Sequence, residues 1–206
     1  DSQAMSINEL IPRAAQFHSW HALGATSAQL GYGVRWILGD ATTDFWVELD
    51  PVNGAVIKLD AMPQPAGWKS VKLVPLPTNH TVPSCAWMFE SKEKAGKFNR
   101  LKAAELRLTS HQQTELGQGR DVTLESGEIL TSASFRSPAL QPRRVIVSGD
   151  TAEQSSGISA VDGVDVLIHE ATFLEATASH ATEHLHTTAK GAVRTAVVCK
   201  AQHLVL

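Results

Sequence analysis

Cysteine is scarce in this sequence, with only two residues in a chain of 206. Cys85 and Cys199 both lie in apolar surroundings, whereas disulfide-stabilised folds carry many cysteines in a short chain. We therefore expect two buried thiols rather than a disulfide, as is usual in a reducing compartment.

Long apolar runs and targeting signals are also lacking. No stretch approaches the roughly 18 consecutive apolar residues of a transmembrane helix, which argues against a membrane protein. The opening residues, DSQAMSINELIPRAAQ, have neither the basic nor the apolar region of a signal peptide. We expect a cytoplasmic protein, with the nucleus or mitochondrion as alternatives in a eukaryote.

The net charge of −3 excludes little by itself, but its distribution is uneven. Residues 91–120 hold seven Lys or Arg and three Glu, so this segment is +4 and the remainder of the chain is −7. A basic segment on an acidic body can follow a polyanion such as RNA. A solvated helix face explains the same charges, and charge alone favours that simpler explanation.

Short strand-like runs fill the first half of the chain. They mix β-branched and aromatic residues with polar ones, and Asn53-Gly54 is a typical hairpin signal. We expect antiparallel strands within residues 33–40, 44–50, 54–60, 68–76 and 82–90. Residues 1–30 indicate a helix followed by a stretch rich in Gly, Ala and Ser, and Ser126-Gly127 marks a further hairpin turn.

The last third of the chain has a different pattern. VIVSGD, VLIHEA and HLVL are continuous apolar runs, typical of buried strands, and residues 187–201 indicate a helix between two of them. This alternation predicts an α/β fold, a layered αββα sandwich of mixed sheets flanked by helices. No repeat or linker divides the chain, so we predict a single domain over 1–206. Because the chain stops on an apolar strand, we expect that domain to be incomplete.

Residues 169–192 contain four of the nine histidines. His169-Glu170 begins like the His-Glu-x-x-His helix of zinc proteases, but Phe173 occupies the position of the second histidine. A zinc-protease helix is therefore excluded, and the chemistry of this stretch depends on residues elsewhere.

Polar side chains follow three of the predicted strands. Asp150 comes after Gly149 at one strand end, His169-Glu170 ends another strand, and His80 lies in a turn between two strands. Imidazole and carboxylate together suit Zn²⁺ or Mn²⁺. Taken singly, the aspartate is more simply a turn residue or helix cap and each histidine a satisfied polar group, so the inference depends on their joint occurrence.

These residues stand in motifs that resemble those of the ribonuclease Z family, tRNA 3′-processing endonucleases of the metallo-β-lactamase fold. The matching segments, in the family's order, are NHTVPSCAWMFE, EKAGKFN with LKAAELRL, GRDVTLESGEIL, VIVSGDT, DVLIHEATF and HLHTTAKGA. Gly-Asp-Thr is widespread among metallo-β-lactamase proteins, whereas His-Glu-Ala-Thr followed by His-Thr-Thr is specific. The resemblance covers residues 76–206, and the strand-rich residues 1–75 match nothing.

The resemblance implies a role for each of four residues. His80 would be a zinc ligand, and Asp150 would bridge two Zn²⁺ ions that clamp a phosphodiester. His186 would donate a proton to the leaving 3′-oxygen, and Glu170 would orient His186 and favour its protonated form. His184, two residues away, is a rival for the role of His186.

The resemblance also implies partners. The substrate would be precursor tRNA, with the basic segment 91–120 contacting the backbone of its acceptor stem, and the protein would form a homodimer. Two alternatives remain open: a metallo-β-lactamase-fold phosphodiesterase for small substrates, and a non-catalytic half-domain that binds RNA or a catalytic partner.

The family's main zinc motif, His-x-His-x-Asp-His, is missing from this sequence. His18 and His21 have the wrong spacing, and the last family ligand follows the strand that matches HLVL, where this chain stops. Since a catalytic zinc site needs at least three protein ligands, we expect the 206-residue chain alone to be inactive and the complete protein to be a zinc-dependent endoribonuclease.

Overall fold

The computed structural model describes residues 9, 11–14, 35–50, 53–81 and 84–206. The predicted helix and Gly/Ala/Ser-rich stretch of residues 1–30, with His18 and His21, thus lie almost wholly outside the described residues. The chain divides into two compact units, one formed by residues 1–90 with 144–206 and the other by residues 91–143.

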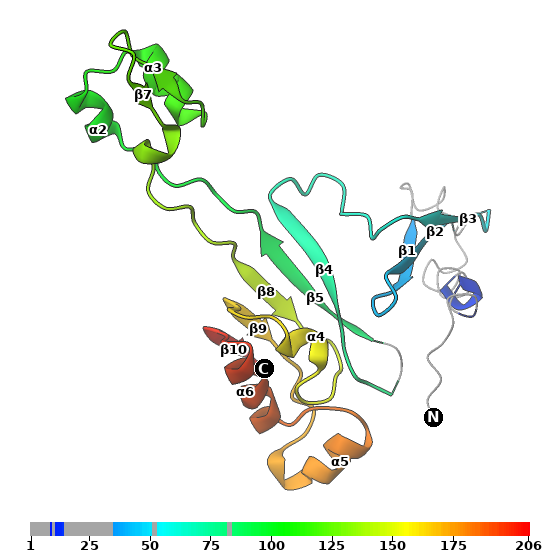
Figure 1. Ribbon diagram of the computed structural model, residues 1–206. Coiled ribbons are helices and arrows are strands. Elements are labelled where there is room, and N and C mark those ends of the chain that lie inside the picture. The colour runs from blue at the N-terminus through cyan, green and yellow to red at the C-terminus, as the bar shows by residue number, and fades with distance from the viewer. Residues whose placement is uncertain (1–8, 10, 15–34, 51–52, 82–83) are drawn as a thin grey trace. The chain divides into compact units, whose positions relative to one another are not determined.

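A five-stranded mixed sheet forms the centre of the first unit (Figure 1). Its strands, in spatial order, are β10 (His203–Val205), β9 (Val166–Ile168), β8 (Arg144–Val147), β5 (Cys85–Ser91) and β4 (Val71–Pro77). β8 pairs with β9 and β9 with β10 in parallel, whereas β5 and β8 are antiparallel. Because the parallel strands share one carboxyl edge, the loops that follow β8 and β9 lie next to each other.

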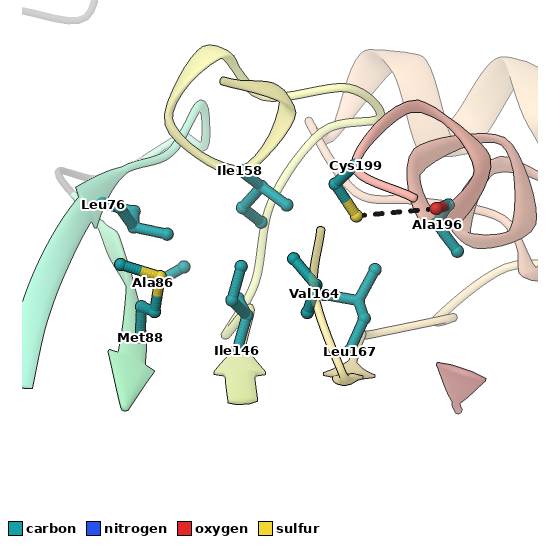
Figure 2. Close-up of a cluster of buried hydrophobic side chains, with 9 residues drawn as sticks. All are labelled: Leu76, Ala86, Met88, Ile146, Ile158, Val164, Leu167, Ala196 and Cys199. Carbon is teal, nitrogen blue, oxygen red and sulfur yellow. Dashed lines mark hydrogen bonds between the residues drawn. The ribbon is translucent and has the colours of Figure 1, made fainter. Parts of the chain in front are cut away.

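One face of this sheet carries a hydrophobic core. Figure 2 shows strand side chains meeting α4 (Ser156–Ser159) and α6 (Ala189–Val198), which lie over the same face. The cluster consists of Leu76, Ala86, Met88, Ile146, Ile158, Val164, Leu167, Ala196 and Cys199. Strand alternation turns Val147, Ile168 and Val205 to the other face, where each is more than a third exposed.

Close backbone contact fixes α4 on the sheet. A Cβ atom at Gly157 would lie 2.3 Å from the carbonyl oxygen of Pro77, so only glycine fits at this position of the helix. α6 begins with a side-chain cap, because the hydroxyl of Thr188 accepts a 2.9 Å hydrogen bond from the amide of Gly191.

A separate antiparallel sheet contains β1 (Trp36–Asp40), β2 (Phe45–Leu49) and β3 (Val56–Leu59). The predicted Asn53-Gly54 turn is confirmed: Gly54 has φ +72° and the Asn53 side chain accepts a hydrogen bond from the amide of Ala55. Trp46 packs across the pairing at Gly39, where a Cβ atom would overlap the indole ring.

The second unit has its own small core. Two helices, α2 (Arg100–Glu105) and α3 (Ser110–Gly117), pack with η1 (Ser132–Phe135) and the hairpin of β6 (Val122–Thr123) and β7 (Ile129–Leu130). The buried side chains are Ala103, Leu108, Leu116, Val122, Leu130 and Phe135. α3 starts with a capping box in which the side chains of Thr109 and Gln112 each accept a hydrogen bond from the other residue's amide.

The α/β prediction, with a mixed sheet flanked by helices, is confirmed, and its metallo-β-lactamase type rests on the sequence resemblance. The predicted hairpin at Ser126-Gly127 and the helix after Thr188 are also found. The fourth and fifth predicted strands, β4 and β5, belong to the five-stranded sheet, and the first three form the separate sheet. Both cysteines are free thiols, as expected, and their burial raises the pKa of each. In the described part of the chain, no helix is both long and apolar enough to cross a bilayer.

Candidate active site

Four side chains predicted from the sequence converge in the first unit. His80 follows β4, Asp150 follows β8, Glu170 follows β9, and His186 lies between α5 (Ala178–Glu183) and α6. The imidazole rings of His80 and His186 are 4.7 Å apart between centroids and meet edge to face. Segments separated by up to 106 positions in the sequence therefore form one cluster.

Glu170 and His186 form a direct pair. A carboxylate oxygen of Glu170 lies 2.9 Å from Nδ1 of His186, and the two side chains are only 8% and 19% exposed. The ring of Phe173 lies 5.9 Å from the imidazole and limits its movement on another side. This pairing fixes one imidazole nitrogen and leaves Nε2 of His186 for other work.

The carboxylate of Glu170 has all of its acceptor positions in use. One oxygen accepts bonds from the amide of Thr151 at 2.8 Å and from His186, and the other accepts from the amide and hydroxyl of Thr172. Burial opposes the charged form, but donors on Thr151, Thr172 and Thr187 outweigh it and hold the pKa of Glu170 below its usual range. Glu170 is therefore an ionised, fixed partner for His186.

Asp150 is positioned by a left-handed residue. Gly149 has φ +58°, which turns the chain sharply at the end of β8 and directs the next residue away from the sheet edge. The loop is anchored just beyond, since the amide of Ala152 donates a 2.7 Å bond to the carbonyl of Asn79. This bond joins the loop after β8 to the turn that carries His80.

His80 is oriented by the chain on the opposite side of the cluster. Its Nδ1 lies 3.0 Å from the carbonyl oxygen of Leu185, the residue before His186. Leu185 itself has φ +52°, and the amide of His186 donates to the carbonyl of Ala181 at 2.8 Å. The end of α5 thus helps to place both histidines.

The residues present fit one divalent ion. Ligand atoms of His80, Asp150 and His186 all lie within 4.8 Å of one another, and two imidazoles with a carboxylate are a donor set that suits Zn²⁺. Nδ1 of His80 is hydrogen-bonded, which is the usual way of presenting Nε2 to a metal, whereas Nε2 of His186 can either ligate an ion or carry a proton, and not both at once. In the described part of the chain the cluster has no fourth donor, so a second ion would need ligands from elsewhere.

The remaining histidines of this stretch lie elsewhere. His169 is buried at 2% exposure and bonds the carbonyl of Glu170 through Nδ1, and desolvation lowers its pKa. His184 is exposed and groups with His180 and Glu183 rather than with Asp150. Because it is not a member of the group formed by His80, Asp150 and His186, the structure gives it no support as a rival to His186.

Sequence reasoning missed the groups that hold Glu170 in place. Thr172 is the last residue of the His-Glu-Ala-Thr motif, and its amide and hydroxyl both donate hydrogen bonds to the Glu170 carboxylate. The hydroxyl of Thr187, itself buried, donates a 2.6 Å bond to the carbonyl of Thr151 and so joins the start of α6 to the loop after β8. Only Thr172 could have been suspected, since a short hydroxyl two residues after a carboxylate can bond to it.

Curated proteins resemble this chain over most of its length. A ribonuclease Z from Parabacteroides distasonis is 30% identical over 158 residues, and one from Porphyromonas gingivalis is 33% identical over 138 residues. One from Synechococcus sp. is 33% identical over 131 residues. The resemblance to ribonuclease Z is confirmed. These alignments cover 77%, 67% and 63% of this chain.

The chain spans about half the length of the ribonuclease Z relatives that it matches, 49%, 45% and 42% of the three. A crystal structure of the short form of human tRNase Z is also similar, with a TM-score of 0.39 and 16% identity. That match covers 82% of this chain and 45% of the human chain. No family model matches the sequence.

Proposed function

We propose that the complete protein is a zinc-dependent endoribonuclease that removes the 3′ trailer from precursor tRNA. This chain would supply the acid–base pair, Glu170 and His186, and two metal donors, His80 and Asp150. The resemblance to ribonuclease Z supports the reaction class. The prediction that the 206-residue chain alone is inactive stands beside it, because part of the ligand set would lie in other residues.

One observation carries the proposal: a buried, ionised carboxylate holds an imidazole beside two further metal-ligand side chains. The Glu170–His186 distance is 2.9 Å, and ligand atoms of His80, Asp150 and His186 all lie within 4.8 Å of one another. Both observations support a site that would combine proton transfer with metal binding. An isolated histidine or aspartate on a loop would not have this combination.

The residues divide the work of hydrolysing a phosphodiester. Zn²⁺, when bound, supplies Lewis acidity and lowers the pKa of water. Nε2 of His186 would hold the proton that passes to the 3′-oxygen as its bond to phosphorus breaks, leaving a 3′-hydroxyl on the tRNA. Glu170 would stabilise the positive charge of the protonated ring and keep Nδ1 fixed throughout. Asp150 would be a metal donor through its carboxylate oxygens.

His186→Ala in the full-length protein tests the assignment. We expect turnover of precursor tRNA to fall by about 10²–10⁴-fold, the usual contribution of a general acid, with little change in RNA affinity. Glu170→Gln should lower turnover with the same pattern, since it removes the negative charge beside Nδ1 of His186. His203→Ala, which changes an exposed histidine of β10, is the matched control and should keep its activity. Unchanged turnover in His186→Ala would refute the acid role.

Substrate choice separates the proposal from its alternatives. A small-substrate phosphodiesterase would hydrolyse a nitrophenyl phosphodiester at least as well as precursor tRNA, and a non-catalytic half-domain would bind RNA without cleaving it. Preferential cleavage of precursor tRNA by the full-length protein supports the endoribonuclease. The homodimer and the cytoplasmic location remain predictions from the resemblance and the sequence.

A further inference from the structure

A second group of metal-ligand side chains lies on α5. We propose that His180, Glu183 and His184 bind one divalent transition-metal ion at the protein surface, in addition to the site formed by His80, Asp150 and His186. Ligand atoms of the three α5 residues all lie within 4.8 Å of one another. The inference does not depend on the proposed endoribonuclease activity.

Helical spacing brings these side chains to one face. Positions i, i+3 and i+4 are neighbours on a helix surface, and a pair of histidines at i and i+4 can ligate a single ion. The last turn is regular here, since the amide of His184 donates a 3.0 Å bond to the carbonyl of His180. Glu183 lies 3.7 Å from Nδ1 of His180, so its carboxylate is already beside the imidazole.

The donor set selects the class of ion. Two imidazoles and one carboxylate suit Zn²⁺, Co²⁺, Ni²⁺ or Cu²⁺, whereas Mg²⁺ and Ca²⁺ prefer oxygen ligands alone. The His180 and Glu183 side chains are 61% and 70% exposed, so water would complete the coordination shell. Affinity should rise from Co²⁺ through Ni²⁺ to Cu²⁺.

An ion bound by His180, Glu183 and His184 would affect the backbone that leads to His186. An ion held by His180 and His184 would link both ends of the last turn of α5, and that turn also accepts the amide of His186 at the carbonyl of Ala181. Leu185, which follows directly, offers its carbonyl to His80. Occupancy would therefore stabilise the backbone that places both histidines of the candidate active site.

Zinc titration of the 206-residue chain by calorimetry tests the site, with ZnCl₂ as the probe. We expect a binding event that persists in Asp150→Asn, where the first site is weakened. His180→Asn and His184→Asn should each weaken that event at least tenfold, since even outer-sphere partners of a metal are worth about 10–100-fold. His203→Asn, which changes an exposed histidine of β10, is the matched control and should bind as before.

Two outcomes would overturn the proposal. One is an Asp150→Asn protein that binds no Zn²⁺ at millimolar concentration, and the other is unchanged affinity in both α5 variants. Circular dichroism checks that each variant is folded, and Glu183→Gln gives a milder third test because it keeps both imidazoles. Replacing Zn²⁺ with Co²⁺ adds an absorption spectrum that reports coordination, which should disappear in His184→Asn.

Hydrogen exchange tests the link to the candidate active site. In Asp150→Asn, added Zn²⁺ should slow exchange of the His186 amide, because closing the last turn of α5 protects the bond to Ala181. Adding His184→Asn to that protein should abolish the effect. Equal exchange rates with and without Zn²⁺ would show that the ion does not stabilise this turn.

Discussion

Asp150 depends for its position on the residue before it. Gly149 adopts φ +58°, a region that costs other residues roughly 1–2 kcal/mol. The nearest atom to a Cβ added at Gly149 would be the carbonyl oxygen of Cys85 at 3.7 Å, an ordinary contact. Substitution here would therefore strain the backbone rather than cause a clash.

Gly149→Ala should lower the free energy of unfolding by about 1–2 kcal/mol and also reduce turnover of the full-length protein. The loss of turnover follows because relaxing the strained angle moves Asp150. Gly163→Ala is the matched control, with φ +78° in open space and no candidate ligand beside it. Denaturant unfolding and an RNA cleavage assay measure the two effects. A loss of turnover in both variants would mean that Asp150 is not involved.

For individual residues, the sequence predicted the reactive side chains better than the groups that hydrogen-bond to them. His80, Asp150, Glu170 and His186 could all be named from strand ends and motifs, because functional side chains collect where strands of an α/β sheet end. The carbonyl of Leu185 could not be predicted as a partner of His80. Every residue has a backbone carbonyl, and only the fold brings this one to His80. Their catalytic and metal-binding roles stay predictions.

Among the elements, α6 is tied to the loop after β8 by an ion pair. Arg194 donates to both oxygens of Glu153, at 2.5 and 2.6 Å. These hydrogen bonds outweigh the effect of burial and hold the pKa of Glu153 below its usual range. Since the folded pKa is the lower one, the pair stabilises the fold above the unfolded pKa of about 4.3, and the stabilisation is lost as pH falls through the folded pKa.

Glu153→Gln should therefore destabilise the protein at pH 7 by about 1 kcal/mol or less, as expected for a partly exposed pair. The difference from the parent protein should shrink as the pH is lowered below about 4. Asp162→Asn is the control, since its partner Lys200 and Asp162 itself are both over 70% exposed. Thermal unfolding across pH measures both, and a constant difference from pH 7 to pH 3 would contradict the linkage.

The packing of α4 gives a second prediction at this scale. Gly157→Ala should destabilise the protein by about 1–3 kcal/mol or more, because the new methyl group would meet the backbone of Pro77. Gly117→Ala, at the end of α3 with nothing within 4 Å, should instead be neutral or stabilising by about 0.5–1 kcal/mol. Denaturant midpoints compare them. Equal effects would mean that α4 can shift away from β4 at little cost.

Strand positions were more predictable than strand partners. The apolar runs located β8, β9 and β10, because burial imposes a composition that can be read locally. The same reasoning predicted strands at β4 and β5 but assigned no partner to either, and in the structure they lie side by side in the five-stranded sheet. Pairing depends on contacts between distant segments, about which local composition carries little information.

For the whole molecule, the uneven charge distribution seen in the sequence corresponds to one part of the structure. The basic segment 91–120 lies within the second compact unit. Arg120 is paired with Glu115, and Lys102 donates to the carbonyl of Ser134. The other cations of this segment, Lys92, Lys94, Lys97, Arg100 and Arg107, are exposed. We propose that these five contact the phosphates of precursor tRNA.

Lys97→Ala with Arg100→Ala should weaken RNA binding and flatten its salt dependence. Each phosphate contact contributes about 0.7–0.9 to the slope of log K against log salt, so the pair should reduce the slope by about 1.4–1.8. Lys69→Ala with Lys72→Ala removes two exposed cations of the first unit and is the control. Filter binding of precursor tRNA to the full-length protein at several salt concentrations gives the slopes. Equal slopes in the two double variants would exclude the basic segment as the contact.

The saturated carboxylate of Glu170 has one more consequence. With four donors already bound, it has no free lone pair to offer a cation, although it lies next to a cluster of metal donors. Excess Zn²⁺ should therefore leave the hydrogen bond between Glu170 and His186 intact. Any inhibition of turnover by excess Zn²⁺ would then act through other residues. Thr172→Val would remove the hydroxyl bond to one oxygen and keep the amide bond, which frees one acceptor position and would make Glu170 a competitor for the ion.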